Sequence, residues 1–423
     1  MSLKNKIYQY IEKLQRYVKI DLFYLIKGES WLMLGKLISI TAAFLLSLAW
    51  ANWIDKEIYG NYQYILSLIG IISIFSLPEI GSALIQAVAR GFEGSFISGF
   101  KIQLKWGFLA SLSALGISGY YGLQGNKNLF WCFLIVAVFL PLFNASLIYF
   151  SFLIGKKLFN VQVKYNSITQ VIATIVMVLT LFLIKKLFFN LPSHIILILI
   201  ISVYFISRTI LRFLFFRATK NRFKPNSKQD PKTISFGKYL TLSGLINIVS
   251  SNLDKILLFH YLGAAELAIY FFAILIPEQI KSPLTHIGDL TLPKFSVRSR
   301  EEIKKTILRK IFFLTLLISS LVFIYIIFAP LLYQIFFPKY LDSISYSRIY
   351  ALSIIPLCFS MGSIFRAKMM TKQIYQMGII VSLIRTALFI TLIPLYGIWG
   401  AIWGILSTRI FSAFLSLFFY RKI

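Results

Sequence analysis

Ionisable side chains inside long apolar runs are the residues of this sequence most able to do chemistry. A charged group near the centre of a membrane helix costs several kcal/mol, about 3 on insertion scales, so it usually faces a cavity or a partner. Two sets are singled out as candidates. The candidate substrate-binding cations are Arg385, Lys281, Lys36 and Arg409. The candidates for ion coupling or ion pairing are Glu79, Glu278, Asp254 and Lys255.

These positions differ in how strongly they indicate a site. Arg385 falls about ten residues into a 21-residue apolar run, and at about 1.5 Å per residue it is too deep to reach either headgroup layer easily. Glu278 and Lys281 are three residues apart, which places them on one helical face as a pair. Lys36 lies near a span end and is equally explained by its ammonium reaching the headgroups. For Arg385 and for the Glu278 and Lys281 pair, structural ion pairing between helices remains the alternative.

The balance of these charges indicates the class of ligand. Apart from four basic residues that are counted with the adjoining cytoplasmic loops (Lys105, Arg208, Arg212 and Arg366), the predicted spans contain six basic residues and four acidic ones, the additions being Arg348 and Asp289. Guanidinium and ammonium groups recognise phosphate, so a cavity with this excess suits an anionic substrate. The three histidines and two cysteines lack metal-ligand spacing. We therefore expect no metal site, no cofactor and no catalytic residues.

The elements that position these charges must be membrane helices. The chain has 423 residues, of which 58% are hydrophobic and only 14% charged, and its mean hydropathy is +0.77. These values exclude an ordinary soluble or nucleic-acid-binding protein, despite a net charge of +29. Apolar runs of about 20 residues predict twelve membrane helices. They are placed at 31–53, 62–84, 102–123, 129–153, 166–184, 192–215, 239–261, 268–290, 311–330, 345–366, 375–395 and 397–419.

The basic residues predict the orientation of these helices. Of the 44 Lys and Arg, 33 lie in the N-terminal segment and every second loop after it, and five lie in the opposite loops. Short loops rich in Lys and Arg stay cytoplasmic, so both termini are predicted to be cytoplasmic. Residues 1–28 carry apolar side chains at helical spacing among basic ones, which predicts an interfacial amphipathic helix on the cell membrane.

The spans divide into two equal sets. The polar, basic segment 217–238 predicts a cytoplasmic linker between an N-lobe over 29–216 and a C-lobe over 239–423. Six spans in each half give both lobes the same orientation, as in transporters built from parallel repeats. The predicted fold is an all-α polytopic membrane protein with two six-helix lobes around a central cavity.

Five short segments resemble a known family. They are Ile58–Tyr62, Leu77–Ala83, Ser251–Leu258, Tyr261–Tyr270 and Pro394–Ala401. They are similar to the polysaccharide, O-antigen type flippases of the multidrug/oligosaccharidyl-lipid/polysaccharide (MOP) exporter superfamily. The resemblance implies a MATE-like fold that alternates between inward-open and outward-open forms. It also implies that an undecaprenyl-pyrophosphate-linked oligosaccharide is carried across the cytoplasmic membrane and that basic cavity residues hold its pyrophosphate.

Three functions are compatible with these features. The leading hypothesis is a lipid-linked oligosaccharide flippase, a secondary transporter for surface polysaccharide biosynthesis. A MATE-like exporter of drugs or cations is the second, and a membrane polymerase or ligase acting on lipid-linked sugars is the third. No nucleotide-hydrolysing G-x-x-x-x-G-K-[ST] loop occurs, and the connectors are short, so a transporter is favoured over an enzyme. The expected partners are the substrate, membrane lipids and other polysaccharide-assembly proteins, with no nucleic acid and a monomeric state.

Overall fold

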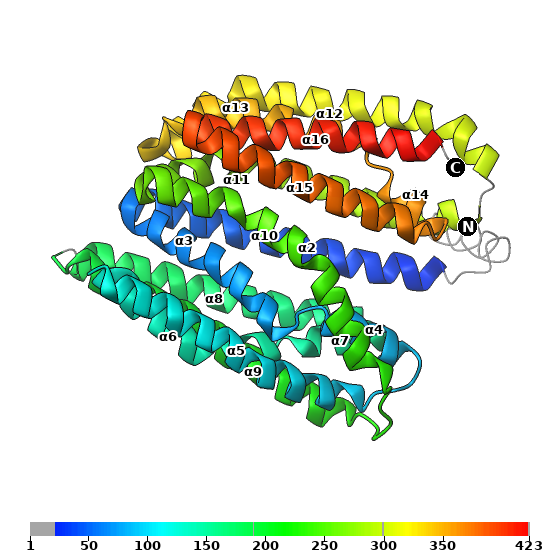
Figure 1. The fold of residues 1–423 in the computed structure, drawn as a ribbon, viewed down its shortest axis with the longest axis horizontal. Coiled ribbons are helices and arrows are strands. Elements are labelled where there is room, and N and C mark those ends of the chain that lie inside the picture. Colours follow the sequence, from blue (N-terminus) through cyan, green and yellow to red (C-terminus); the bar gives the residue numbers. More distant parts are fainter. Residues whose placement is uncertain (1–21, 189, 298–299, 422–423) are drawn as a thin grey trace, which may run out of the picture.

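The computed structural model describes residues 22–188, 190–297 and 300–421, and the regular secondary structure in these ranges is all helical (Figure 1). Residues 1–21 of the predicted interfacial segment 1–28 lie outside the described residues. The helices of the first half are α2 (Leu22–Trp53), α3 (Lys56–Ile72), η1 (Ser73–Ser76), α4 (Ile80–Ala89), α5 (Ser95–Leu123), α6 (Lys127–Ala145), α7 (Ile148–Gly155), α8 (Phe159–Leu187) and α9 (Ser193–Phe223). Those of the second half are α10 (Lys232–Leu262), α11 (Ala264–Val297), α12 (Arg300–Phe336), η2 (Pro338–Tyr340), α13 (Ser343–Leu352), η3 (Ile355–Phe359), α14 (Gly362–Ala367), α15 (Thr371–Tyr396) and α16 (Ile398–Arg421).

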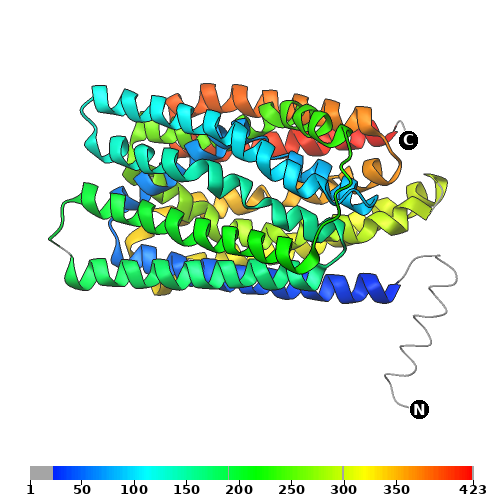
Figure 2. The ribbon, with the colours of Figure 1, turned by 90° about the horizontal axis from the view of Figure 1, so that it is seen from below.

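Each of the twelve predicted spans falls on a helical segment. Ten segments of the described chain are long and apolar enough to cross a membrane, and α5 and α11 run beside them. The helices lie roughly parallel along the long axis of the molecule (Figure 2). Large apolar side chains are exposed on their outer faces, for example Phe312 and Phe323 of α12, each 64% exposed. An apolar exterior over parallel helices of this length fits a lipid surrounding.

Three spans are interrupted rather than continuous. The second predicted span is α3, η1 and α4, with Leu77 in a left-handed conformation (φ 54°) just before Pro78. Proline cannot donate a backbone hydrogen bond, which explains the break at this point. The fourth span divides into α6 and α7 between Ala145 and Ile148, and the tenth divides at η3, which contains Pro356.

Two very short turns organise the second half. A single residue joins α10 to α11 and α15 to α16, and these residues are Gly263 (φ 89°) and Gly397 (φ 56°). Positive φ values are accessible to glycine at little cost, so each helix can reverse direction within one residue. These turns place α11 beside α10 and α16 beside α15.

The helices form two groups that meet along α3, α4, α10 and α11 (Figure 1). In the N-terminal group, α2 packs on α8 and α6 packs on α5 and α9. In the C-terminal group, α11 packs on α13 and α10 packs on α15. Leu22 at the start of α2 and Arg421 at the end of α16 lie at the same end of the bundle.

Candidate functional site

A polar cavity of about 460 Å³ lies inside the C-terminal group of helices. Its charged lining residues are six of the eight predicted site residues: Asp254, Lys255, Glu278, Lys281, Arg385 and Arg409. They come from α10, α11, α15 and α16, which are separated in sequence by up to about 150 residues. The sequence predicted a cavity between the lobes, whereas these charges line a cavity formed by helices of one lobe.

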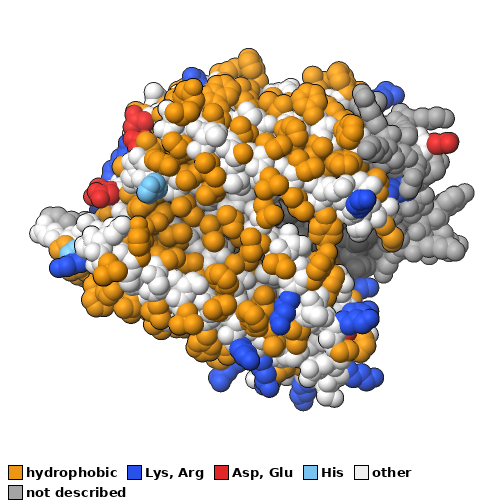
Figure 3. Space-filling view, viewed as in Figure 1, with side chains coloured by type: hydrophobic (Ala, Val, Ile, Leu, Met, Phe, Trp, Pro, Cys, Tyr) orange, Lys and Arg blue, Asp and Glu red, His pale blue; other side chains and the backbone are white. Residues whose placement is uncertain are grey.

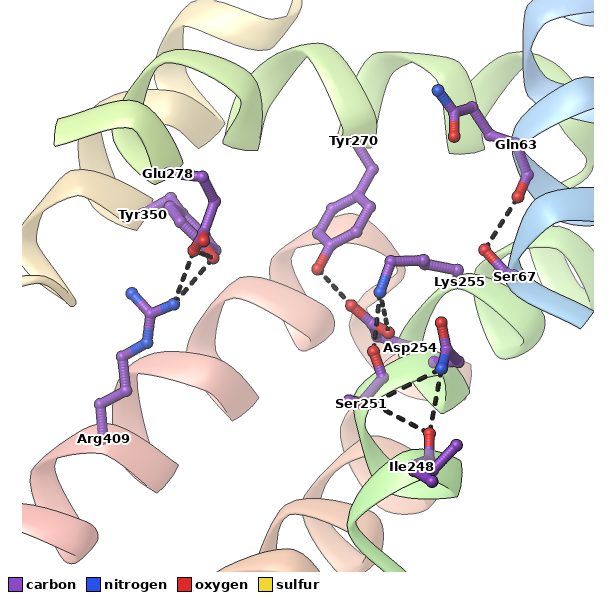
Figure 4. Close-up of polar contacts among 11 residues, drawn as sticks. Gln63, Ser67, Ile248, Ser251, Asp254, Lys255, Tyr270, Glu278, Tyr350 and Arg409 are labelled. Atoms are coloured by element: carbon purple, nitrogen blue, oxygen red, sulfur yellow. Dashed lines mark hydrogen bonds and ion pairs between the residues drawn. The ribbon is translucent and has the colours of Figure 1, made fainter. Parts of the chain in front are cut away.

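Glu278 of α11 is the centre of one network in this cavity (Figure 4). Its Oε1 accepts hydrogen bonds from Arg409 Nη2 at 2.8 Å and from the Tyr350 hydroxyl. Its Oε2 accepts from the Lys281 ammonium group. Arg409 also donates from Nη1 to the Ser353 hydroxyl at 2.7 Å. The network therefore joins α11, α13 and α16 through one carboxylate.

Asp254 of α10 is the centre of a second network (Figure 4). Its Oδ2 accepts a hydrogen bond from the Tyr270 hydroxyl at 2.6 Å, and its Oδ1 accepts from Lys255 Nζ at 3.1 Å. Lys255 Nζ also donates to the backbone carbonyl of Ser251 at 2.8 Å. Only 6% of the Asp254 side chain is exposed, so its charge is stabilised mainly by these two donors.

Arg385 of α15 is the cation of this cavity that forms no ion pair with a carboxylate of the described residues. Among the residues that the structure describes, its guanidinium makes no hydrogen bond or ion pair, although the side chain is partly buried and lines the cavity. The lining contains four basic and two acidic residues, an excess of two positive charges. Because Asp254 is paired with Lys255, and Glu278 with Lys281 and Arg409, Arg385 is the group best placed to bind an anion.

The remaining two predicted residues lie elsewhere. Lys36 is on α2, where the neighbouring Gly35 faces Val163 of α8, and it does not line the cavity. Glu79 precedes α4 in the N-terminal group, and it accepts a hydrogen bond from the Ser82 hydroxyl at 2.6 Å. The structure does not bring either residue to the six charges of the C-terminal lobe.

Two arginines inside the N-terminal group were missed by sequence reasoning. Arg208 and Arg212 fall within the predicted span 192–215 but were counted with the adjoining basic loop, whereas the structure places both on α9. The Arg212 guanidinium lies 3.9 Å from the Phe143 ring centroid and donates to the Phe143 carbonyl at 3.2 Å. Arg208 lies over the ring of Tyr204 at 4.8 Å. The spacing of four residues from Tyr204 to Arg208 to Arg212 was the available signal.

Comparison with solved structures defines the class of fold. Two similar structures are an outward-facing and an inward-facing conformation of a multidrug resistance MATE family transporter of the MOP superfamily. The outward-facing structure is 13% identical, covers 94% of this chain and 95% of its own, and has a TM-score of 0.65. The inward-facing structure is 12% identical, covers 90% of this chain and 94% of its own, and has a TM-score of 0.69. A MOP superfamily transporter from Pyrococcus furiosus is 14% identical, covers 94% of this chain and 95% of its own, and has a TM-score of 0.65. The predicted MATE-like fold is confirmed.

The sequence comparison defines the family within that class. Residues 25–276 match the family described as polysaccharide biosynthesis protein. This match covers more than half of the chain, so the chain belongs to the polysaccharide biosynthesis protein family. The chain is therefore a multi-pass membrane protein of this family with a MATE-like fold. No match was found among curated proteins.

Proposed function

We propose that this protein is a flippase that carries undecaprenyl-pyrophosphate-linked oligosaccharide repeat units across the cytoplasmic membrane. The observation that carries the proposal is Arg385, which has no ion-pair partner among the described residues and lines a polar cavity with two excess positive charges. A pyrophosphate is a multivalent anion, and a guanidinium can bind it through two parallel hydrogen bonds. The cavity volume of about 460 Å³ is within the range of about 300–1,000 Å³ for small-molecule sites.

The acidic residues give this cavity a way to release its ligand. In the structure, the Glu278 carboxylate occupies donors of Lys281 and Arg409 that a phosphate group would also use. A phosphate held first by Arg385 can exchange with this carboxylate for the same donors. Binding is then moderate rather than irreversible, because every new bond to phosphate replaces an existing ion pair. A transporter needs such a balance, since the substrate must leave at the other side.

Uncharged polar groups supply sites for the sugar part of the substrate. The hydroxyl groups of Ser251, Thr408 and Ser412 line the same cavity. In the neighbouring lobe, α3 packs against α10, and Gln63 and Ser67 lie on the side of α3 that faces α10 (Figure 4). Hydroxyl and amide groups both donate and accept hydrogen bonds, as sugar hydroxyls require. We place the sugar between this face of α3 and the cavity.

Movement of one lobe against the other provides alternating access. The lobes meet through α3 against α10 and α11, and through α4 against α10. The helix is interrupted at Leu77 and Pro78, between α3 and α4 and within this contact, and we place the joint for this movement there. Membrane orientation follows the basic residues: the end with Leu22 and Arg421 faces the cytoplasm, as do both termini. Lys and Arg side chains gather at this end over the ends of α5, α9 and α10 (Figure 3).

Two alternative functions are less well supported. Export of a drug or another cation calls for acidic lining residues in excess, whereas here basic residues outnumber them by two. The Pyrococcus furiosus transporter is described as having a binding pocket of reverse polarity that suggests a different function, so pocket charge varies within this fold. A polymerase or ligase is disfavoured by the transporter fold. Resistance to cationic drugs on expression in an efflux-deficient strain is the result that would favour the export function.

Complementation tests the proposal. The gene is deleted in a polysaccharide-producing host and restored with the wild-type, Arg385→Ala or Lys372→Ala form at equal protein level. Lys372 lies on the same helix, is exposed and does not line the cavity, so it is a matched control. We expect surface polysaccharide to return with the wild type and with Lys372→Ala, and to be strongly reduced with Arg385→Ala. Full restoration by Arg385→Ala would remove this residue from the transport path.

A further inference from the structure

A second cavity, separate from the polar cavity, opens between α5 and α9 in the N-terminal lobe. It has a volume of about 470 Å³. Its lining residues are Phe100, Phe213, Phe216, Arg217, Lys220 and Asn221. We call it the α5–α9 groove. It shares no residue with the cavity around Arg385, so the proposed transport site does not account for it.

The α5–α9 groove has an aromatic floor and a polar rim. The rings of Phe100 and Phe216 stack with centroids 4.1 Å apart, which joins the two helices across the floor. Phe213 lies nearly parallel to Phe216 at 6.2 Å, and the Arg217 guanidinium sits 5.0 Å from the Phe213 ring centroid. Arg217, Lys220 and Asn221 are exposed. An apolar surface therefore ends directly in two cations and an amide.

Helix length places this groove at the edge of the membrane. Phe213 lies twenty residues after Ser193, where α9 begins. At about 1.5 Å per residue that distance is about 30 Å, the thickness of the hydrocarbon layer. Phe100 lies a similar distance from Leu123, the other end of α5. The aromatic floor is thus at the depth of the first acyl carbons, and the polar rim is at the depth of the headgroups.

The positive charges of Arg217 and Lys220 are not neutralised by acidic residues of the groove. No acidic residue is among its lining residues. Two acidic residues at the same end of the lobe already have partners, since Asp230 pairs with Arg90 at 2.5 Å and Glu93 pairs with Lys156 at 2.5 Å. Arg217 and Lys220 therefore remain available to an external anion.

We propose that the α5–α9 groove is a binding site for an anionic phospholipid such as phosphatidylglycerol. Its phosphodiester would bind the Arg217 guanidinium and the Lys220 ammonium, and its glycerol headgroup would bind the Asn221 amide. An acyl chain would lie on the rings of Phe100 and Phe213. Basic pockets next to membrane helices at the headgroup level are known to favour such lipids. This lipid is a structural or regulatory ligand, separate from the transported substrate.

Native mass spectrometry of the delipidated, full-length protein tests the site. The protein is titrated in turn with phosphatidylglycerol, phosphatidylcholine and undecaprenyl phosphate. The test variant is Arg217→Ala/Lys220→Ala, and the control variant is Arg222→Ala/Lys228→Ala. The control removes the same charge from exposed residues of the same end that do not line the groove. Thermal unfolding of all three proteins checks that the substitutions leave the fold intact.

We expect phosphatidylglycerol to bind the wild type and the control more tightly than phosphatidylcholine. With each basic residue contributing about 1 kcal/mol, the test variant should bind phosphatidylglycerol about thirty-fold more weakly. Equal binding of the two phospholipids, or unchanged binding of phosphatidylglycerol to the test variant, would overturn the proposal. Tighter binding of undecaprenyl phosphate than of phosphatidylglycerol, lost in the test variant, would show that the groove receives the substrate lipid instead. These outcomes are independent of whether Arg385 acts in transport.

Discussion

Replacing Arg409 by alanine should destabilise the protein much more than replacing Arg385, because only Arg409 is part of a hydrogen-bonded network. Arg409→Ala removes three hydrogen bonds, to Ser353 at 2.7 Å, to Glu278 at 2.8 Å and to Tyr350 at 2.9 Å. Breaking a buried ion pair costs about 3–5 kcal/mol. The Glu278 side chain is 30% exposed and would keep its bond to Lys281, so we expect a smaller loss of about 2–3 kcal/mol in the free energy of unfolding.

Arg385→Ala removes no hydrogen bond or ion pair among the described residues. It also lowers the uncompensated positive charge of the cavity, so the free energy of unfolding should change by no more than about 0.5 kcal/mol. Reversible unfolding of the variants in mixed detergent micelles measures both values. Arg409→Lys is the control for charge, since lysine keeps the cation but loses the planar fork, and it should fall between wild type and Arg409→Ala. Equal destabilisation by Arg385→Ala and Arg409→Ala would refute the assignment of Arg385 as the unpaired cation.

Three further predictions concern the cavity, the contact between the lobes and the orientation. Glu278→Gln raises the excess positive charge of the cavity lining from two to three. Phosphate should therefore bind about five- to tenfold more tightly, as measured by calorimetry, and transport should be slower. Unchanged phosphate affinity would argue against competition by this carboxylate. Gly60→Ala places a carbon 1.8 Å from the backbone oxygen of Ala264, so it should lower the unfolding midpoint at a cost of about 1–3 kcal/mol. Gly116→Ala, which has open space around the added carbon, should leave the midpoint unchanged. Equal midpoints for the two variants would contradict the close approach of the helices at Gly60. A single cysteine at exposed Ser227 should be labelled by an impermeant maleimide only after cells are opened, and labelling of intact cells would reverse the orientation.

The membrane helices were predictable from sequence because each depends on local composition. Twenty apolar residues in a row must be helical in lipid, whatever the rest of the chain does. The interruption of the second span is likewise a local effect, because Pro78 has no backbone N–H to donate to the helix. The predicted span ended at residue 215 and the predicted linker began at 217, whereas α9 continues to Phe223, because the basic residues from Arg217 onward resemble a loop although they continue the helix. Charge alone does not separate a basic helix end from a basic connector.

The arrangement of the site was only partly predictable. The spacing of Glu278 and Lys281 indicates a pair on one helix face, and the structure shows that contact. That Arg409 joins the same carboxylate depends on how α16 packs near α11 and α13, which is tertiary information. Tyr350 donates to Glu278, yet nothing in its local sequence distinguishes it from the other 22 tyrosines. That these charges lie together within one lobe also depends on tertiary packing, which the local sequence does not reveal.

Flipping of a lipid-linked sugar by the purified protein tests the central claim most directly. Proteoliposomes would contain a fluorescent undecaprenyl-pyrophosphate saccharide and either the wild type, Arg385→Ala or Lys372→Ala, with exposure of the sugar at the opposite leaflet as the measurement. The proposal predicts transfer by the wild type and by Lys372→Ala, and at least a tenfold slower transfer by Arg385→Ala, because about 1.4 kcal/mol of phosphate binding accounts for a factor of ten. Transfer by Arg385→Ala at the wild-type rate, or none by the wild type, would contradict it.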